Sequence, residues 1–147
     1  MSKTILFVDD EKQILKALRR LFMQKDYTCF FAESAEAALE TLRNHHIDLI
    51  VTDIKMPTMD GYRLLKLVKD KYPTTLRACF SGYSDEGLIL KTLEDNLAEL
   101  YLFKPWDNKK LMSTIENILE KDTKTAIKSG AYSFKYNGSF VCAATCV

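Results

Sequence analysis

The sequence predicts an α/β protein in which one mostly parallel sheet is covered by helices on both faces. Five short apolar runs alternate along the chain with five longer segments whose apolar residues recur at helical spacing. The runs are nearly continuous instead of alternating with polar residues, which is typical of strands buried on both faces. Parallel strands need crossover connections, and the helical segments between the runs supply them.

The beginning of the chain contains two strand–helix units. Residues 4–8 form the first strand, because this run is too continuous to be half-exposed. A helix follows over about residues 11–25, where one apolar stripe lies opposite lysines and arginines. Residues 27–32 form the second strand, and Ser34 can cap the helix that runs to about residue 44.

Three further units complete the predicted fold. Residues 47–52 form the third strand, Pro57 and Gly61 mark the loop after it, and Asp60 can cap the third helix. The remaining elements are a strand over 76–80, a helix over 84–94, a strand over 99–103 and a helix from the cap Asp107 to about residue 121. Five such units favour the flavodoxin-like (βα)5 fold with strand order 2-1-3-4-5, in which sites lie at the carboxyl ends of strands.

Acidic residues follow two strands that this order makes neighbours. Asp9 and Asp10 end the first strand, and Asp53 ends the third. Three converging carboxylates raise one another's pKa unless a cation lies among them. One such aspartate would be explained as a helix cap, and Asp10 can also serve as one. The set of three on a shallow rim instead indicates a site for Mg²⁺, which prefers oxygen ligands.

A hydroxyl and an ammonium group flank this acidic centre. Ser81 ends the fourth strand and Lys104 ends the fifth. Taken singly, Ser81 is an ordinary turn residue and Lys104 an ordinary surface charge. Together with a carboxylate nucleophile and a divalent cation, they suit phosphoryl transfer, in which positive charge neutralises the transferred oxygens.

In sequence, these strand ends resemble the receiver domains of two-component response regulators. The resemblance spans about residues 3–121. The matching segments, in chain order, are residues 8–11, 53–61, 80–85 and 101–106. Lys104-Pro105-Trp106 resembles the Lys-Pro-Trp subgroup, which is often joined to cyclic-dinucleotide or transcriptional output domains.

The resemblance implies a role for each acidic residue. Asp53 would be the phosphoacceptor. Asp10 and Asp53 would bind Mg²⁺ directly together with the backbone carbonyl of Lys55, and Asp9 would act largely through water.

The resemblance also implies how the phosphoryl group is held and sensed. Lys104 would contact a phosphoryl oxygen and Asp53, and the Lys104–Pro105 peptide bond would be cis. Ser81 would donate a hydrogen bond to the phosphoryl group, and Tyr101 would be the switch aromatic that turns into the space opened when Ser81 moves.

Two positions depart from the family pattern. Ser81 stands where threonine is commoner, so it keeps the hydroxyl and lacks the methyl group. Asn96 and Leu97 replace the glycines that often precede the fifth strand in the Lys-Pro-Trp subgroup. Asparagine tolerates a left-handed backbone, so Asn96 could serve as a helix C-cap.

The resulting expectation is a phosphorelay signalling module that is not an enzyme acting on other substrates. Its partners would be a sensor histidine kinase or phosphotransfer protein, followed by an effector or a second copy bound through the face of the fourth helix, fifth strand and fifth helix. The alternative is a Mg²⁺-dependent aspartate-nucleophile phosphatase of the haloacid-dehalogenase kind, with Asp9 as nucleophile. That chemistry places a second aspartate two residues on, where this chain has Glu11.

Composition argues against other partners. The chain carries 47% hydrophobic and 28% charged residues with a net charge of +1, and it has no basic recognition helix. Direct nucleic-acid binding is therefore not expected. No apolar run approaches the roughly 20 residues that span a bilayer, and no signal peptide is evident, so the expected location is the cytoplasm, without membrane binding.

The C-terminal part of the chain differs from the rest. We expect a receiver domain over residues 1–121 and a tail over 122–147, which begins with a polar, linker-like stretch. Asn137-Gly138 between alternating apolar residues predicts a β-hairpin. The tail is too short for an output domain, so the chain is either a stand-alone receiver or a piece of something longer.

Overall fold

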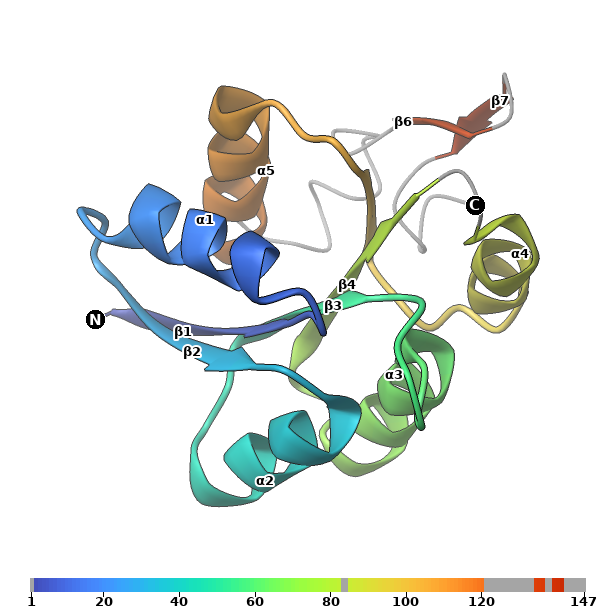
Figure 1. Cartoon of the computed structure of the whole chain (residues 1–147), viewed down its shortest axis with the longest axis horizontal. Coiled ribbons are helices and arrows are strands. Elements are labelled where there is room, and N and C mark those ends of the chain that lie inside the picture. The colour runs from blue at the N-terminus through green and yellow to red at the C-terminus, as the bar shows by residue number, and fades with distance from the viewer. Residues whose placement is uncertain (1, 83–84, 121–133, 137–138, 142–147) are drawn as a thin grey trace.

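A computed structural model describes residues 2–82, 85–120, 134–136 and 139–141, and it confirms the flavodoxin-like fold (Figure 1). The main sheet is parallel, with strand order β2-β1-β3-β4-β5. Its strands are β1 (Lys3–Val8), β2 (Tyr27–Ala32), β3 (Leu49–Asp53), β4 (Leu76–Ser81) and β5 (Leu100–Phe103). The helices are α1 (Lys12–Phe22), α2 (Ala35–Asn44), α3 (Gly61–Lys71), α4 (Glu86–Glu94) and α5 (Asn108–Glu120).

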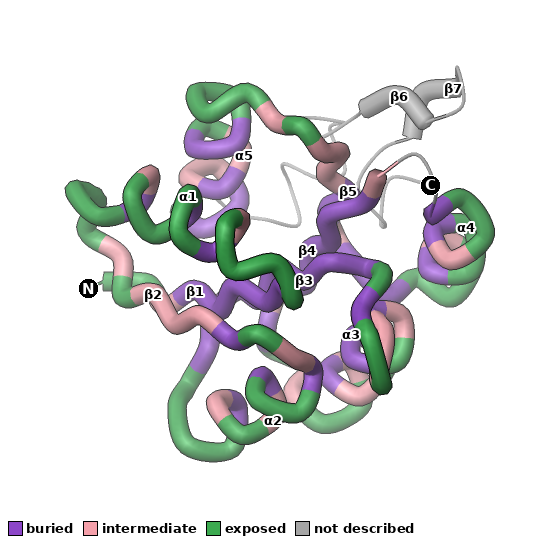
Figure 2. Tube along the Cα trace, viewed as in Figure 1, coloured by how far each residue is buried: buried purple, intermediate pink, exposed green. Residues whose placement is uncertain are grey.

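The sheet separates two hydrophobic cores. In β1, Ile5 and Phe7 face the core beneath α1 and α5, whereas Leu6 and Val8 face the core shared with α2, α3 and α4. Successive side chains of a strand point to opposite faces, so a strand covered on both sides must be apolar at every position. Figure 2 shows the inner strands buried along most of their length, which accounts for the continuous apolar runs in the sequence.

Three predicted helix caps, Ser34, Asp60 and Asp107, are confirmed in the structure, whereas Asp10 is not a cap, because Glu11 is the N-cap residue of α1 and no described side chain caps that helix. Each cap side chain accepts a backbone N–H in the first turn of its helix, which satisfies a group that has no partner inside the helix. The bonds are Ala37 N to Ser34 Oγ (3.1 Å), Arg63 N to Asp60 Oδ1 (2.9 Å), and Lys109 N and Lys110 N to Asp107 Oδ1 (2.9 and 3.1 Å).

Two predicted boundaries are displaced by a few residues. The first helix ends at Phe22 instead of near residue 25, because the apolar stripe stops there and Met23 is 69% exposed. The third strand begins at Leu49 instead of residue 47, and in front of it the Asp48 carboxylate accepts the Thr4 backbone N–H at 2.8 Å. Asn96 adopts the left-handed conformation expected of it, with φ 55°.

The tail contains a second, separate pair of strands. β6 (Phe134–Tyr136) and β7 (Ser139–Val141) pair antiparallel where the sequence predicts a hairpin. The turn predicted at 137–138 and the linker from residue 122 lie outside the described residues. In the part of the chain that the structure describes, no helix is both long and apolar enough to cross a membrane.

Candidate functional site

The three predicted acidic residues meet at the carboxyl edge of the sheet. Asp9 and Asp10 follow β1, and Asp53 ends β3, which pairs directly with β1. Each contributes a carboxylate oxygen to a group whose members all lie within 4.8 Å of one another. Asp9 and Asp53 are buried and Asp10 is exposed, so the group opens to solvent on one side.

Lys104 reaches this group from the end of β5. Its Nζ donates to Asp9 Oδ2 at 2.8 Å and lies 3.4 Å from Asp53 Oδ1. Burial works to lower the pKa of Lys104, but the two carboxylates outweigh it and raise that pKa above its ordinary value. The ammonium group therefore stays charged beside the acids. The Lys104–Pro105 peptide bond is cis, as predicted.

One ammonium group does not neutralise the acids. Burial and then the Asp9 charge raise the pKa of Asp53 to about 7, and Lys104 offsets only part of this effect. An all-oxygen donor set with surplus negative charge, open to solvent on one side, fits a hard divalent cation that keeps some of its water. These residues are thus able to hold Mg²⁺.

Both carboxylate oxygens of Asp9 accept hydrogen bonds from within the domain. Its Oδ2 accepts from Lys104, and its Oδ1 accepts the Glu11 backbone N–H at 2.9 Å. The residue is 1% exposed. Both oxygens are held, so Asp9 is poorly placed to attack a substrate, which weighs against the phosphatase alternative.

Ser81 stands at the end of β4, one residue after the partner of Asp53 in the strand register. It is 1% exposed, and among the described residues its Oγ is a buried side-chain atom without a hydrogen-bond partner. A buried hydroxyl without a partner costs free energy, which native proteins rarely leave uncompensated. The hydroxyl is thus available to an incoming acceptor such as a phosphoryl oxygen.

The loop after β3 approaches Asp53 very closely. Gly61 N donates to Ile54 O at 2.7 Å, and a Cβ at position 61 would lie 2.2 Å from the Asp53 carbonyl oxygen. Only glycine fits there. Sequence reasoning identified Gly61 as a loop marker and missed this positioning role, since the approach joins residues eight apart. Lys55, whose carbonyl was expected to bind the metal, lies in this loop with its side chain exposed.

Tyr101 is already turned inward in this structure. It is 1% exposed, and its hydroxyl donates to Thr92 O at 3.1 Å. The expectation that Tyr101 turns into a space opened when Ser81 moves stays a prediction, and any such turn would start from this buried position. Packing decides this rotamer: Tyr101 belongs to the core beneath α4, beside its strand partner Cys79.

A sequence model described as the response regulator receiver domain matches residues 5–116. The chain is 33% identical over 128 residues to the hydrogenase transcriptional regulatory protein HoxA of Bradyrhizobium diazoefficiens, covering 84% of this chain and 26% of that protein. It is 31% identical over 123 residues to the response regulator GtcR of Aneurinibacillus migulanus, covering 82% and 49%. The chain thus spans between a quarter and a half of these relatives.

Solved structures show the same similarity. The signal receiver domain of an HD domain-containing protein from Pseudomonas fluorescens superposes with a TM-score of 0.78 at 35% identity, covering 82% of this chain and 96% of that chain. The BeF3-activated DrrB receiver domain superposes with a TM-score of 0.72 at 26% identity, covering 82% and 100%.

Proposed function

This chain belongs to the response regulator receiver family, and from that premise we propose that Asp53 is the residue that takes the phosphoryl group. As a receiver, the domain is a phosphoacceptor module of two-component signalling and not an enzyme in its own right. The observation that carries the assignment is the position of Asp53, which lies among Asp9, Asp10 and the Lys104 ammonium.

In this proposal, Asp10 and Asp53 would hold Mg²⁺ directly together with the Lys55 carbonyl, and Asp9 would act through water and through Lys104. Bound Mg²⁺ would neutralise charge on the phosphoryl oxygens. A carboxylate oxygen of Asp53 attacks phosphorus while the bond to the donor histidine nitrogen breaks, and that nitrogen keeps the electron pair. Lys104 then pairs with a phosphoryl oxygen, and Ser81 donates to another.

Receiver domains partner histidine kinases, and we propose a sensor histidine kinase or phosphotransfer protein as the donor here. The output surface would be the face of α4, β5 and α5, bound by an effector or a second copy. We propose that this chain belongs to the Lys-Pro-Trp subgroup, in which an output domain often accompanies the receiver, as an HD domain accompanies the similar receiver from Pseudomonas fluorescens. We place this signalling in the cytoplasm, without direct nucleic-acid or membrane contact.

The test is phosphorylation by a small donor. Incubation with acetyl phosphate and Mg²⁺ should add one phosphoryl group, which peptide mapping should locate on Asp53. EDTA should prevent the reaction, and Asp53→Asn should abolish it. Asp26→Asn is a matched control at an exposed site remote from the acidic group. Full labelling of Asp53→Asn, or mapping to Asp9, would overturn the assignment.

A further inference from the structure

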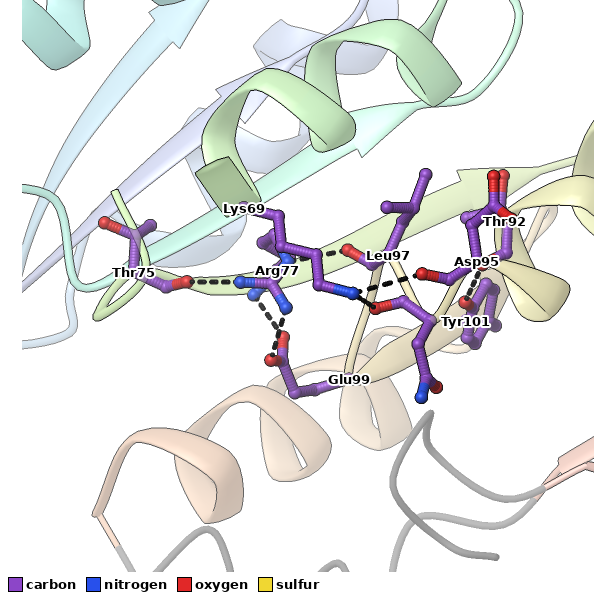
Figure 3. A network of polar contacts seen from close by, with 9 residues as sticks. Lys69, Thr75, Arg77, Thr92, Asp95, Leu97, Glu99 and Tyr101 are labelled. Carbon is purple, nitrogen blue, oxygen red and sulfur yellow. Dashed lines mark hydrogen bonds and ion pairs between the residues drawn. The ribbon is translucent and has the colours of Figure 1, made fainter. Parts of the chain in front are cut away.

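The turn between α4 and β5 is bound on several sides by polar side chains. Lys69, in the last turn of α3, donates from Nζ to the carbonyl oxygens of Asp95 at 3.1 Å and Asn96 at 3.2 Å (Figure 3). The Tyr62 hydroxyl, also on α3, donates to the Asp95 carboxylate. A cation at carbonyls just past a helix end is favourable, because those groups lack partners in the helix.

A buried ion pair holds the far side of the same turn. Arg77, at the start of β4, donates from Nε to Leu97 O at 2.7 Å and from Nη2 to Glu99 Oε1 at 3.1 Å. The side chains of Arg77 and Glu99 are only 9% and 14% exposed. The Arg77 backbone N–H also donates to Glu99 Oε2 at 2.6 Å, and the Glu99 backbone N–H donates to Arg77 O at 2.7 Å. Separating Arg77 from Glu99 would leave an uncompensated buried charge, so this ion pair resists displacement of the turn.

Tyr101 completes the set from inside the domain. Its hydroxyl donates to Thr92 O, in the last turn of α4 (Figure 3). We define the turn clamp as Tyr62, Lys69, Arg77, Glu99 and Tyr101. These five residues come from α3, β4, the residue before β5, and β5, and they hold the C-terminal end of α4.

The N-terminal end of α4 is connected through Asp85 and Gly82 to Ser81, which lies at the acidic site. Asp85, just before the helix, is buried and accepts the Gly82 backbone N–H on Oδ2 at 2.8 Å, and its own N–H donates to Gly82 O at 3.2 Å. Gly82 follows Ser81 directly. In the first turn of α4, a Cβ added at Gly87 would meet nothing within 4 Å, so space lies beside that turn.

We infer that Lys69 and Arg77 are positioning residues for the signal, because they fix the C-terminal end of α4 as the pivot about which the helix turns. A shift of Ser81 toward a phosphoryl group would carry Gly82 and Asp85 with it, and the clamp holds residues 95–97. The result is a tilt of α4 from its N-terminal end instead of a sliding of the whole helix. The direction of signalling rests on the proposed function, but the clamp itself does not.

Amide hydrogen exchange on the full chain without any phosphoryl mimic tests the clamp. The amides of Asp95, Asn96 and Leu97 donate to carbonyls of α4 and should exchange more slowly than those of Leu90 and Lys91. In Lys69→Met the three turn amides should exchange at least about fivefold faster. Lys71→Met is the matched control, because Lys71 is also a last-turn lysine of α3 but is exposed, and it should change exchange less than about twofold.

Equal exchange rates at Leu90 and Lys91 and at residues 95–97 in the parent protein, or equal effects of Lys69→Met and Lys71→Met, would overturn the inference. Beryllofluoride then tests the signal, with fluorine NMR reporting occupancy at Asp53. Backbone shifts should change at residues 86–90 and stay nearly constant at 95–97, and Lys69→Met should spread the change to 95–97. Absence of beryllofluoride binding would contradict the proposed function, whereas the exchange rates decide the clamp separately.

Discussion

At the scale of single residues, burial and neighbouring charge set the state of Asp53. Its pKa is raised to about 7 in the folded protein by burial and then by Asp9, whereas an aspartate in an unfolded chain titrates near its ordinary 3.8. Between these values the folded state keeps the proton that the unfolded state loses. The free energy of unfolding therefore falls as pH rises through this window and stays low above pH 7.

Replacing Asp53 with asparagine should remove this penalty. In EDTA at pH 8 we expect Asp53→Asn to raise the free energy of unfolding by roughly 1–4 kcal/mol, and the gain should shrink as pH falls toward 5. Urea unfolding at both pH values measures it. Added Mg²⁺ should stabilise the parent and leave the variant nearly unchanged. A variant less stable than the parent at pH 8 would show that Lys104 already compensates the charge.

Replacing Ser81 with alanine should weaken signalling without lowering the stability of the fold. Its Oγ is buried without a partner, so Ser81→Ala should keep or raise the free energy of unfolding, by up to about 1 kcal/mol. Asp53 should still accept phosphate, more slowly, since one hydrogen bond to the phosphoryl group is lost. Amide NMR with beryllofluoride should show smaller changes around Tyr101. Identical shifts in variant and parent would mean that the signal leaves the pocket by another route.

At the scale of elements, the start of α3 is pressed against the end of β3. A Cβ at Gly61 would lie 2.2 Å from Asp53 O and 2.7 Å from Ile54 Cα, whereas at Gly87 it would meet open space. Both glycines lie in the first turn of a helix, so they form a matched pair. The backbone of Asp53 and Ile54 could make room for a Cβ at position 61 only by moving, and this movement would displace Asp53 itself.

Gly61→Ala should therefore weaken both the fold and the metal site. We expect it to lower the free energy of unfolding by about 2 kcal/mol or more through backbone displacement, whereas Gly87→Ala should raise it by up to about 1 kcal/mol through helix propensity. Mg²⁺ titration followed by Trp106 fluorescence should show weaker binding only for Gly61→Ala. Unchanged Mg²⁺ affinity in that variant would show that the loop can relax without moving Asp53.

At the scale of the whole molecule, the sheet and both cores lie upstream of the tail. The described core residues extend only as far as Leu119 in α5. Deleting residues 123–147 should thus leave folding, measured by cooperative thermal unfolding, and Mg²⁺-dependent phosphorylation intact. Residues 1–122 would then fold as a domain. An insoluble or unfolded truncated protein would place part of the tail in the core and move the proposed boundary.

The local pattern of the sequence was sufficient to predict the helices and strands and to predict which residues meet at the acidic site. Apolar runs without alternation indicated strands covered on both faces, and the caps Ser34, Asp60 and Asp107 marked the helix starts because capping involves residues only two or three apart. Parallel strands end at one edge, so Asp53 and Lys104 could be brought together from strand order alone.

Only the tertiary structure decided features that depend on how distant segments pack. The inward position of Tyr101, the pairing of Arg77 with Glu99 and the close approach of Gly61 to the acceptor strand have no local signature. Each depends on how closely neighbouring helices and strands approach one another, and the side-chain volumes of the whole core determine that spacing together. The sequence by itself therefore determined which groups surround the acceptor, and packing determined how the helix beside it is held.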